Sequence, residues 1–174
     1  IGILGLGYLG KFIATKLKSL NYNVIGYKNT ISAAKYSIPI YYKKSLKTFL
    51  KLSDIIVSVL PATKETRDLI NKSFLNQMKK KSLLINIGRG SSLNEMDLLK
   101  HIKQNNFFFA SLDVFKKEPL PKNSKLWKNQ NITVTPHVAA ITDVDSSINY
   151  IFSKFEQFRT NGKIKSDVKI KNGY

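Results

Sequence analysis

Short apolar runs alternate with amphipathic segments along most of the chain. Residues 1–4 form an apolar run that predicts a strand, and Leu9, Ile13 and Leu17 then recur at the spacing of a helix that buries one face. The run NVIGY at residues 23–27 predicts a second buried strand, so the chain opens with a β-α-β unit. Five further runs are predicted strands, at residues 38–42, 54–60, 82–88, 107–115 and 131–135.

Helical patterns separate most of these strands. Leu46, Phe49 and Leu50 form one apolar face, and Asn94 is the predicted N-terminal cap of a later helix. Continuous apolar strands that alternate with amphipathic helices are typical of a parallel sheet covered on both faces. The predicted fold is therefore α/β, a doubly wound parallel sheet of the Rossmann type.

The C-terminal part of the chain has a different pattern. An apolar stripe predicts one long helix, which Thr142 or Asp143 would cap, and a polar, charged tail follows Gly162. We expect residues 1–141 to form one domain, and the tail after Gly162 to be either a frayed terminus or a strand-like segment of a neighbouring domain. The stripe consists of Ile148, Ile151, Phe152, Phe155 and Phe158.

The composition argues against several classes of protein. The net charge of +18 suggests nucleic-acid binding, but the charge is almost all lysine spread along the chain, and Arg67, Arg89 and Arg159 are the only arginines. We therefore expect no nucleic-acid partner. No apolar run approaches the roughly 20 residues that cross a bilayer, so we expect no membrane partner and a cytoplasmic location. With no cysteine and two histidines, we expect no metal site.

The first glycines of the chain form the pattern GxGxxG between a predicted strand and a predicted helix. Gly5 would permit the tight turn, Gly7 would let a pyrophosphate approach the backbone, and Gly10 would allow close contact between helix and strand. The helix N-terminus would then face the phosphates. Turn glycines alone can produce this pattern, but the β-α-β context favours a dinucleotide site.

The end of the second strand predicts which dinucleotide binds. An NAD-binding unit usually has Asp or Glu about 20 residues after the glycines, where the carboxylate holds the ribose 2′-hydroxyl. Lys28, Asn29 and Thr30 occupy that place here, and a lysine would attract a 2′-phosphate. We therefore expect NADP(H) to be preferred, with NAD(H) possible. The alternative is that Lys28 is one more surface lysine.

Further titratable side chains follow the later predicted strands. Arg89 stands where ligands bind in parallel sheets and could clamp a carboxylate with two parallel hydrogen bonds; alternatively it makes a salt bridge at the sheet edge. Asp113 also ends a strand, and Glu118 either faces His137 or is a loop charge. A carboxylate beside His137 would favour the imidazolium, a general acid able to protonate an alkoxide. His101 is predicted to be a surface residue.

Five sequence blocks follow one another in a characteristic order, and together they cover nearly the whole chain. They are GLGYLG at residues 5–10, LPATKETRDLIN at 60–71, INIGRG at 85–90, LDVFKKEPLP at 112–121 and LWKNQNITVTPHVAA at 126–140. Their order resembles the D-isomer-specific 2-hydroxyacid dehydrogenases. Within that family, TPHVAAIT followed by a long helix and a terminal NGY is most similar to the reductases of glyoxylate and hydroxypyruvate.

The resemblance implies a role for each candidate residue. Arg89 would bind the substrate carboxylate and carbonyl, His137 would be the acid/base, and Glu118 would hold and charge that histidine. Asp113 would take the nicotinamide carboxamide. The other implied cofactor contacts are Tyr8, Leu9, Leu60, Pro61, Thr66, Ile87, Gly88, His137 and Ala139.

The resemblance also implies a reaction, the NADPH-dependent reduction of a short 2-oxo acid, glyoxylate or hydroxypyruvate, to the 2-hydroxy acid. The family fold has a second domain, built mainly from the N-terminal part, which binds substrate. The resemblance implies that residues 1–141 are the dinucleotide-binding domain and that the helix and tail of residues 142–174 would complete the substrate domain. We expect this chain to be the cofactor-binding half, with little turnover by itself. The family suggests a homodimer for the complete protein. The alternative function is a catalytically inactive nucleotide-binding Rossmann module.

Overall fold

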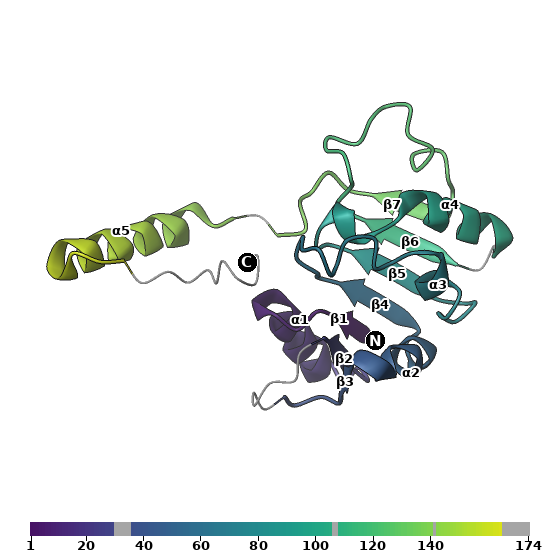
Figure 1. The fold of residues 1–174 in the computed structure, drawn as a ribbon, viewed down its shortest axis with the longest axis horizontal. Coiled ribbons are helices and arrows are strands. Elements are labelled where there is room, and N and C mark those ends of the chain that lie inside the picture. The colour runs from purple at the N-terminus through teal and green to yellow at the C-terminus, as the bar shows by residue number, and fades with distance from the viewer. Residues whose placement is uncertain (30–35, 106–107, 141, 165–174) are drawn as a thin grey trace. The chain divides into compact units, whose positions relative to one another are not determined.

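The computed structural model describes residues 1–29, 36–105, 108–140 and 142–164 (Figure 1). Contacts divide the chain into two compact units, Ile1–His137 and Val138–Tyr174. Thr30, a predicted cofactor contact, lies outside the described residues, as does most of the tail after Gly162. The assignment of residues 142–174 to a substrate domain stays a prediction.

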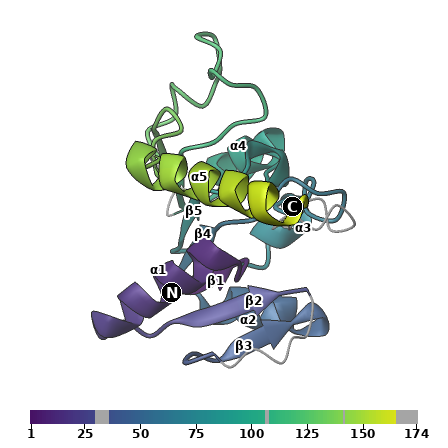
Figure 2. The same cartoon turned by 90° about the vertical axis from the view of Figure 1, so that its left-hand side faces the viewer.

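The first unit is built on one seven-stranded sheet. Its strand order is β3-β2-β1-β4-β5-β6-β7, and every neighbouring pair is parallel. The order from β3 to β5 can be followed in Figure 2. The predicted α/β fold with a parallel sheet is confirmed. The strands are β1 (Gly2–Leu4), β2 (Ile25–Lys28), β3 (Ile40–Tyr42), β4 (Ile55–Ser58), β5 (Leu83–Asn86), β6 (Phe109–Leu112) and β7 (Ile132–Val134).

Four helices accompany the sheet in the described residues of this unit. They are α1 (Tyr8–Ser19), α2 (Leu46–Leu52), α3 (Lys72–Leu75) and α4 (Glu95–Gln104), with short 3-10 turns at Lys43–Ser45 and Gly90–Ser92. The predicted cap of α4 is confirmed, since the Asn94 side chain accepts a hydrogen bond of 3.1 Å from the Asp97 amide. Satisfying a free amide at the helix start fixes where the helix begins.

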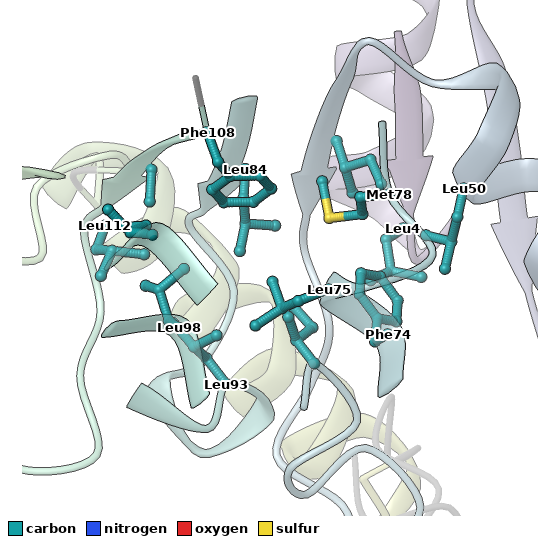
Figure 3. Packing of buried hydrophobic residues seen from close by; sticks show 14 of the residues in the cluster. Leu4, Leu50, Phe74, Leu75, Met78, Leu84, Leu93, Leu98, Phe108 and Leu112 are labelled. Atoms are coloured by element: carbon teal, nitrogen blue, oxygen red, sulfur yellow. The ribbon is translucent and has the colours of Figure 1, made fainter. Parts of the chain in front are cut away.

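Alternating residues of the strands face two separate cores. Leu4 and Ile56 pack with α2, α3 and α4 in one cluster, part of which is shown in Figure 3. Ile3 and Val57 face the opposite side and pack with Ala14 of α1. Figure 1 shows α1 and α2 on opposite sides of β1. The clusters therefore confirm a sheet with apolar contacts on both faces, which explains why its strands are apolar runs and not alternating ones.

The second unit contains one long helix, α5 (Val144–Asn161). The Asp143 side chain caps it by accepting a 2.8 Å hydrogen bond from the Ser146 amide, and Gly162 ends it with a left-handed backbone, at φ 63°. The predicted apolar stripe is present, and each of its side chains is at least 46% exposed. Neither α5 nor another helix of the described ranges is long and apolar enough to cross a membrane.

His101 is not the surface residue that the sequence predicted. It lies in α4 beside the buried Ile102, and its ring meets Phe108 edge-on at 4.7 Å between centroids. Its Nδ1 lies 3.2 Å from Oδ1 of Asn76. The prediction failed because neighbouring lysines suggested a solvated face, whereas the ring turns toward the core. Burial lowers the pKa of His101 below its ordinary value of 6.5.

This burial predicts a loss of stability in mild acid. As pH falls below about 6.5, the unfolded chain binds a proton at His101 more readily than the folded chain does, so the free energy of unfolding should decrease. The variant His101→Gln should lack this part of the pH dependence. Urea unfolding at about pH 7.5 and about pH 5.5 measures it. His137→Gln is the control. If His137→Gln reduced the difference in unfolding free energy between the two pH values as much as His101→Gln does, the pH dependence could not be assigned to His101.

Candidate active site

The strand order places the candidate residues at one edge of the sheet. From β1 the chain proceeds outward through β2 to β3, and from β4 it proceeds in the other direction to β7, so the order reverses between β1 and β4. Ligands of open parallel sheets bind beyond the carboxyl ends of the strands at such a reversal. The glycine turn follows β1, and the segment with Leu60 and Pro61 follows β4.

The glycine turn has the geometry of a dinucleotide site. Gly5 has φ 102°, and a Cβ at Gly10 would lie 2.0 Å from the carbonyl oxygen of Gly5, so helix and turn meet at a distance that no larger residue permits. Gly7 precedes α1 without a side-chain cap, and a Cβ there would meet no atom within 4 Å. The space in front of Gly7 is therefore open, and the free amides of the helix start face it.

A second close contact joins the ends of β4 and β5. A Cβ at Gly88 would lie 2.6 Å from the amide nitrogen of Leu60, so these two backbones touch. The Thr66 hydroxyl, which is buried, donates a 2.6 Å hydrogen bond to the carbonyl of Pro61 and thereby closes the turn after β4. The side chain of Thr66 thus shapes this predicted cofactor wall through the position of Pro61.

The end of β2 carries the residues predicted to choose the cofactor. The Lys28 ammonium donates a 3.0 Å hydrogen bond to the Tyr36 hydroxyl and lies 5.4 Å from the centre of that ring. The Tyr27 hydroxyl donates to Oδ1 of Asn29 at 3.2 Å. Lys28 is thus half-buried and held in a defined place rather than extended into solvent as the surface-lysine alternative would have it.

Glu118 and His137 form an ion pair at the other end of the edge. Nδ1 of His137 lies 2.7 Å from Oε2 of Glu118, and Oε1 accepts a 2.9 Å hydrogen bond from the Phe115 amide. Glu118 is therefore not an isolated loop charge. His137 has φ 56°, a left-handed conformation that costs a residue other than glycine about 1–3 kcal/mol. Such strain persists only where surrounding contacts impose it, and it is common at functional sites.

The environment of Glu118 keeps its carboxylate ionised. Partial burial is the largest single influence and raises the pKa, but the Phe115 amide, the hydrogen bond and charge of His137, and the charge of Arg89 together outweigh it. The net pKa of Glu118 is therefore lowered. The Glu118 carboxylate holds the imidazole ring through Nδ1, and Nε2 takes no part in this pair.

Arg89 lies close enough to Glu118 for its charge to act on that carboxylate. Its side chain is exposed, and Nη1 donates a 2.8 Å hydrogen bond to the carbonyl of Gly88. The following residue, Gly90, makes the approach possible, since a Cβ there would lie 2.0 Å from the carbonyl carbon and oxygen of Phe115. The arginine segment therefore packs directly on the backbone whose amide holds Glu118.

Asp113 is fixed between the ends of β6 and β7. Its side chain is buried, and Oδ1 accepts a 2.5 Å hydrogen bond from the Thr135 hydroxyl. Its amide donates to the carbonyl of Asn86, which ends β5. Asp113 therefore lies on the same edge of the sheet as Arg89 and His137.

A cavity of about 430 Å³ opens beside the Glu118–His137 pair. Phe115, Leu120 and Trp127 contribute apolar walls, and the Trp127 indole nitrogen donates a 3.1 Å hydrogen bond to the carbonyl of Pro121. The sequence did not identify Trp127 as part of the site. Two features of the sequence could have indicated Trp127. It is the only tryptophan of the chain, and it precedes the predicted strand that leads to His137.

The remaining predicted contacts differ in exposure. Tyr8 is 93% exposed at the start of α1, and Leu9 and Ile87 are half-buried. Ala139 belongs to the second unit, whereas His137 ends the first. In the described ranges, no group of three or more His, Cys, Asp or Glu side chains is placed to hold a metal ion.

The family follows from a comparison with known proteins. The family model described as "D-isomer specific 2-hydroxyacid dehydrogenase, NAD binding domain" matches residues 1–139. The chain belongs to this family. The resemblance inferred from the five sequence blocks is thereby confirmed.

Relatives within the dehydrogenase family are longer than this chain. Glyoxylate/hydroxypyruvate reductase A of Photorhabdus laumondii is 38% identical over 174 residues, which are 100% of this chain and 56% of that protein. The reductase A of Yersinia enterocolitica is 30% identical over the same shares. The chain thus spans little more than half the length of these curated relatives.

Two solved dehydrogenase structures are similar to the whole chain. The D-isomer-specific 2-hydroxyacid dehydrogenase of Xanthobacter autotrophicus Py2, in complex with NADPH and MES, superposes with a TM-score of 0.92 at 32% identity, over 100% of this chain and 72% of that chain. The NADPH-dependent glyoxylate/hydroxypyruvate reductase of Sinorhizobium meliloti, in complex with NADP and sulfate, gives 0.91 at 32% identity, over 99% and 56%.

Two glycines of this dehydrogenase domain should respond differently to alanine. Gly90→Ala should lower the free energy of unfolding by about 1–3 kcal/mol, because the new methyl group collides with the Phe115 backbone. Gly7→Ala should change it by less than about 0.5 kcal/mol, because the space is open and φ is −71°, yet it should weaken nucleotide binding. Urea unfolding and equilibrium nucleotide titration measure both effects. Equal losses of stability would show that the contact of Gly90 is wrongly assigned.

Proposed function

We propose that this chain is the cofactor-binding half of an NADPH-dependent reductase that converts a short 2-oxo acid, glyoxylate or hydroxypyruvate, to the 2-hydroxy acid. The observation that carries the proposal is the 2.7 Å pair of His137 and Glu118, with the charge of Arg89 acting on the same carboxylate. An acid, its orienting carboxylate and a cation for the substrate carboxylate are the groups that carbonyl reduction needs.

Each of the three side chains has one task in the proposed reaction. Arg89 binds the carboxylate of the 2-oxo acid and polarises the adjacent carbonyl. His137, protonated and held through Nδ1 by Glu118, gives the proton on Nε2 to the carbonyl oxygen as negative charge develops there. Glu118 stays ionised and holds the His137 ring in place for the transfer.

The chain has a suitable binding place for a dinucleotide. The open space at Gly7 and the uncapped start of α1 fit a pyrophosphate, and Lys28 at the end of β2 fits a 2′-phosphate. The bound nicotinamide supplies the hydride. Asp113, which the Thr135 hydroxyl holds, would accept a hydrogen bond from its carboxamide. The similar structures from Xanthobacter and Sinorhizobium, which contain NADPH and NADP, support this choice of cofactor.

The complete enzyme needs more than these residues. Curated relatives are nearly twice as long, so we propose that a second domain encloses the substrate and that residues 142–174 contribute to it. We also propose that the complete protein is a homodimer, as the family suggests. The chain alone is then expected to bind cofactor and to turn over little substrate.

Substitutions at the proposed catalytic residues should abolish most activity of the complete protein. His137→Gln should lower kcat about 10²–10⁴-fold, because the proton donor is lost. Arg89→Ala should lower kcat/KM about 100-fold, because the substrate carboxylate loses its partner. NADPH oxidation with glyoxylate or hydroxypyruvate is the assay. Arg159→Ala is the matched control, since that arginine pairs with Glu156 on α5, and wild-type rates in both test variants would refute the assignment.

The cofactor preference should depend on Lys28. Lys28→Asp should weaken NADPH binding at least about 10-fold, because a carboxylate would repel the 2′-phosphate, and should leave NADH binding nearly unchanged. Equilibrium titration of each nucleotide gives the ratio of dissociation constants. A similar change for both nucleotides would mean that Lys28 does not recognise the 2′-phosphate.

The alternative function is a nucleotide-binding module without catalysis. Such a module would gain thermal stability with NADPH and show no turnover in its complete form. The ion pair of His137 and Glu118 favours the enzyme, because binding a nucleotide requires no acid at that place.

A further inference from the structure

Three side chains from separate segments meet beside the carboxyl end of β2. The Lys11 ammonium, from the first turn of α1, lies 5.3 Å from the centre of the Tyr36 ring, and the Lys28 ammonium lies 5.4 Å from the same centre. Lys28 also donates its 3.0 Å hydrogen bond to the Tyr36 hydroxyl. Two cations therefore gather around one aromatic ring.

This arrangement brings two positive charges close together. A tyrosine ring attracts a cation more weakly than an anion does. Lys11 is exposed, and none of the ion pairs among the described residues includes it. The first turn of α1 also holds no acidic residue, so Lys11 faces the positive end of its own helix. Both features favour an anion beside Lys11.

The position of the cluster identifies the kind of anion. β1 and β2 are neighbours, and the Gly5 amide donates a 3.0 Å hydrogen bond to the carbonyl of Tyr27, so the glycine turn and the end of β2 lie side by side. A dinucleotide with its pyrophosphate at the glycine turn places the adenosine ribose over the end of the second strand. The group that distinguishes NADP(H) from NAD(H) there is the dianionic 2′-phosphate.

We propose that Lys11 is a second cation for the 2′-phosphate of NADP(H), and that Tyr36 is the positioning residue that holds Lys11 and Lys28 on either side of that group's place. The inference rests on the proposed function, since it assumes that a dinucleotide binds at the glycine turn. It assigns cofactor selection to α1 as well as to the end of β2, through a residue that the GxGxxG pattern leaves unspecified.

The test is equilibrium titration of the complete protein with NADPH, NADH, 2′,5′-ADP and ADP. Lys11→Gln should weaken NADPH and 2′,5′-ADP about 10-fold and change NADH and ADP less than about 2-fold. Lys11→Arg should keep the wild-type preference within about 3-fold, because it keeps the cation. Lys16→Gln is the matched control, from the same helix, where the ammonium lies 5.7 Å from the Phe12 ring.

The outcomes separate this inference from the function on which it rests. If the wild-type protein binds NADPH and NADH, and Lys11→Gln weakens both equally or neither, the inference is wrong and the proposed function stands. If the wild-type protein binds neither nucleotide, the proposed function itself fails. If Lys16→Gln lost as much selectivity for NADPH over NADH as Lys11→Gln, the inference would also be wrong. The effect would then come from the net charge of the protein and not from the position of Lys11.

Discussion

The contact between Gly90 and the backbone of Phe115 is the constraint on which the candidate active site depends. It joins the turn after β5, which carries Arg89, to the turn after β6, whose Phe115 amide holds Glu118. The carboxylate in turn holds His137 beyond β7. The contact between these two backbones thus helps to hold together Arg89, Glu118 and His137, which follow three neighbouring strands. A side chain at residue 90 would push the segment of Arg89 away from the segment that holds Glu118 and His137.

The sheet and the location of the site could be predicted from the sequence because both depend on local patterns. Apolar runs predict the strands, and the carboxyl ends of parallel strands lie at one edge of the sheet. The sequence therefore predicts that Arg89, Asp113 and His137 lie at that edge. The strand limits were less accurate. The predicted run at 54–60 yields a strand of Ile55–Ser58. Leu60 lies beyond the strand but belongs to the same core cluster, so the apolar run is longer than the strand.

Other features could not be predicted because they depend on contacts between distant segments. In a lysine-rich sequence, a lysine with a defined partner looks the same as one on the solvated surface. Lys11 differs from the neighbouring lysines by its contact with the Tyr36 ring, which the sequence does not show. The same composition made His101 look solvated, although its ring packs on Phe108. The pairing of Glu118 with His137 was one of two alternatives, since spacing along the chain does not determine which way a loop carboxylate turns.

Trp127 gives the protein an intrinsic optical reporter. It is the only tryptophan in the chain, its ring is 50% exposed, and it lines the same cavity as His137. Indole fluorescence shifts in wavelength and intensity when water around the ring is replaced by protein or ligand atoms. Emission from this single residue therefore reports a change of contents in that cavity without any added label, and the signal carries no background from a second tryptophan.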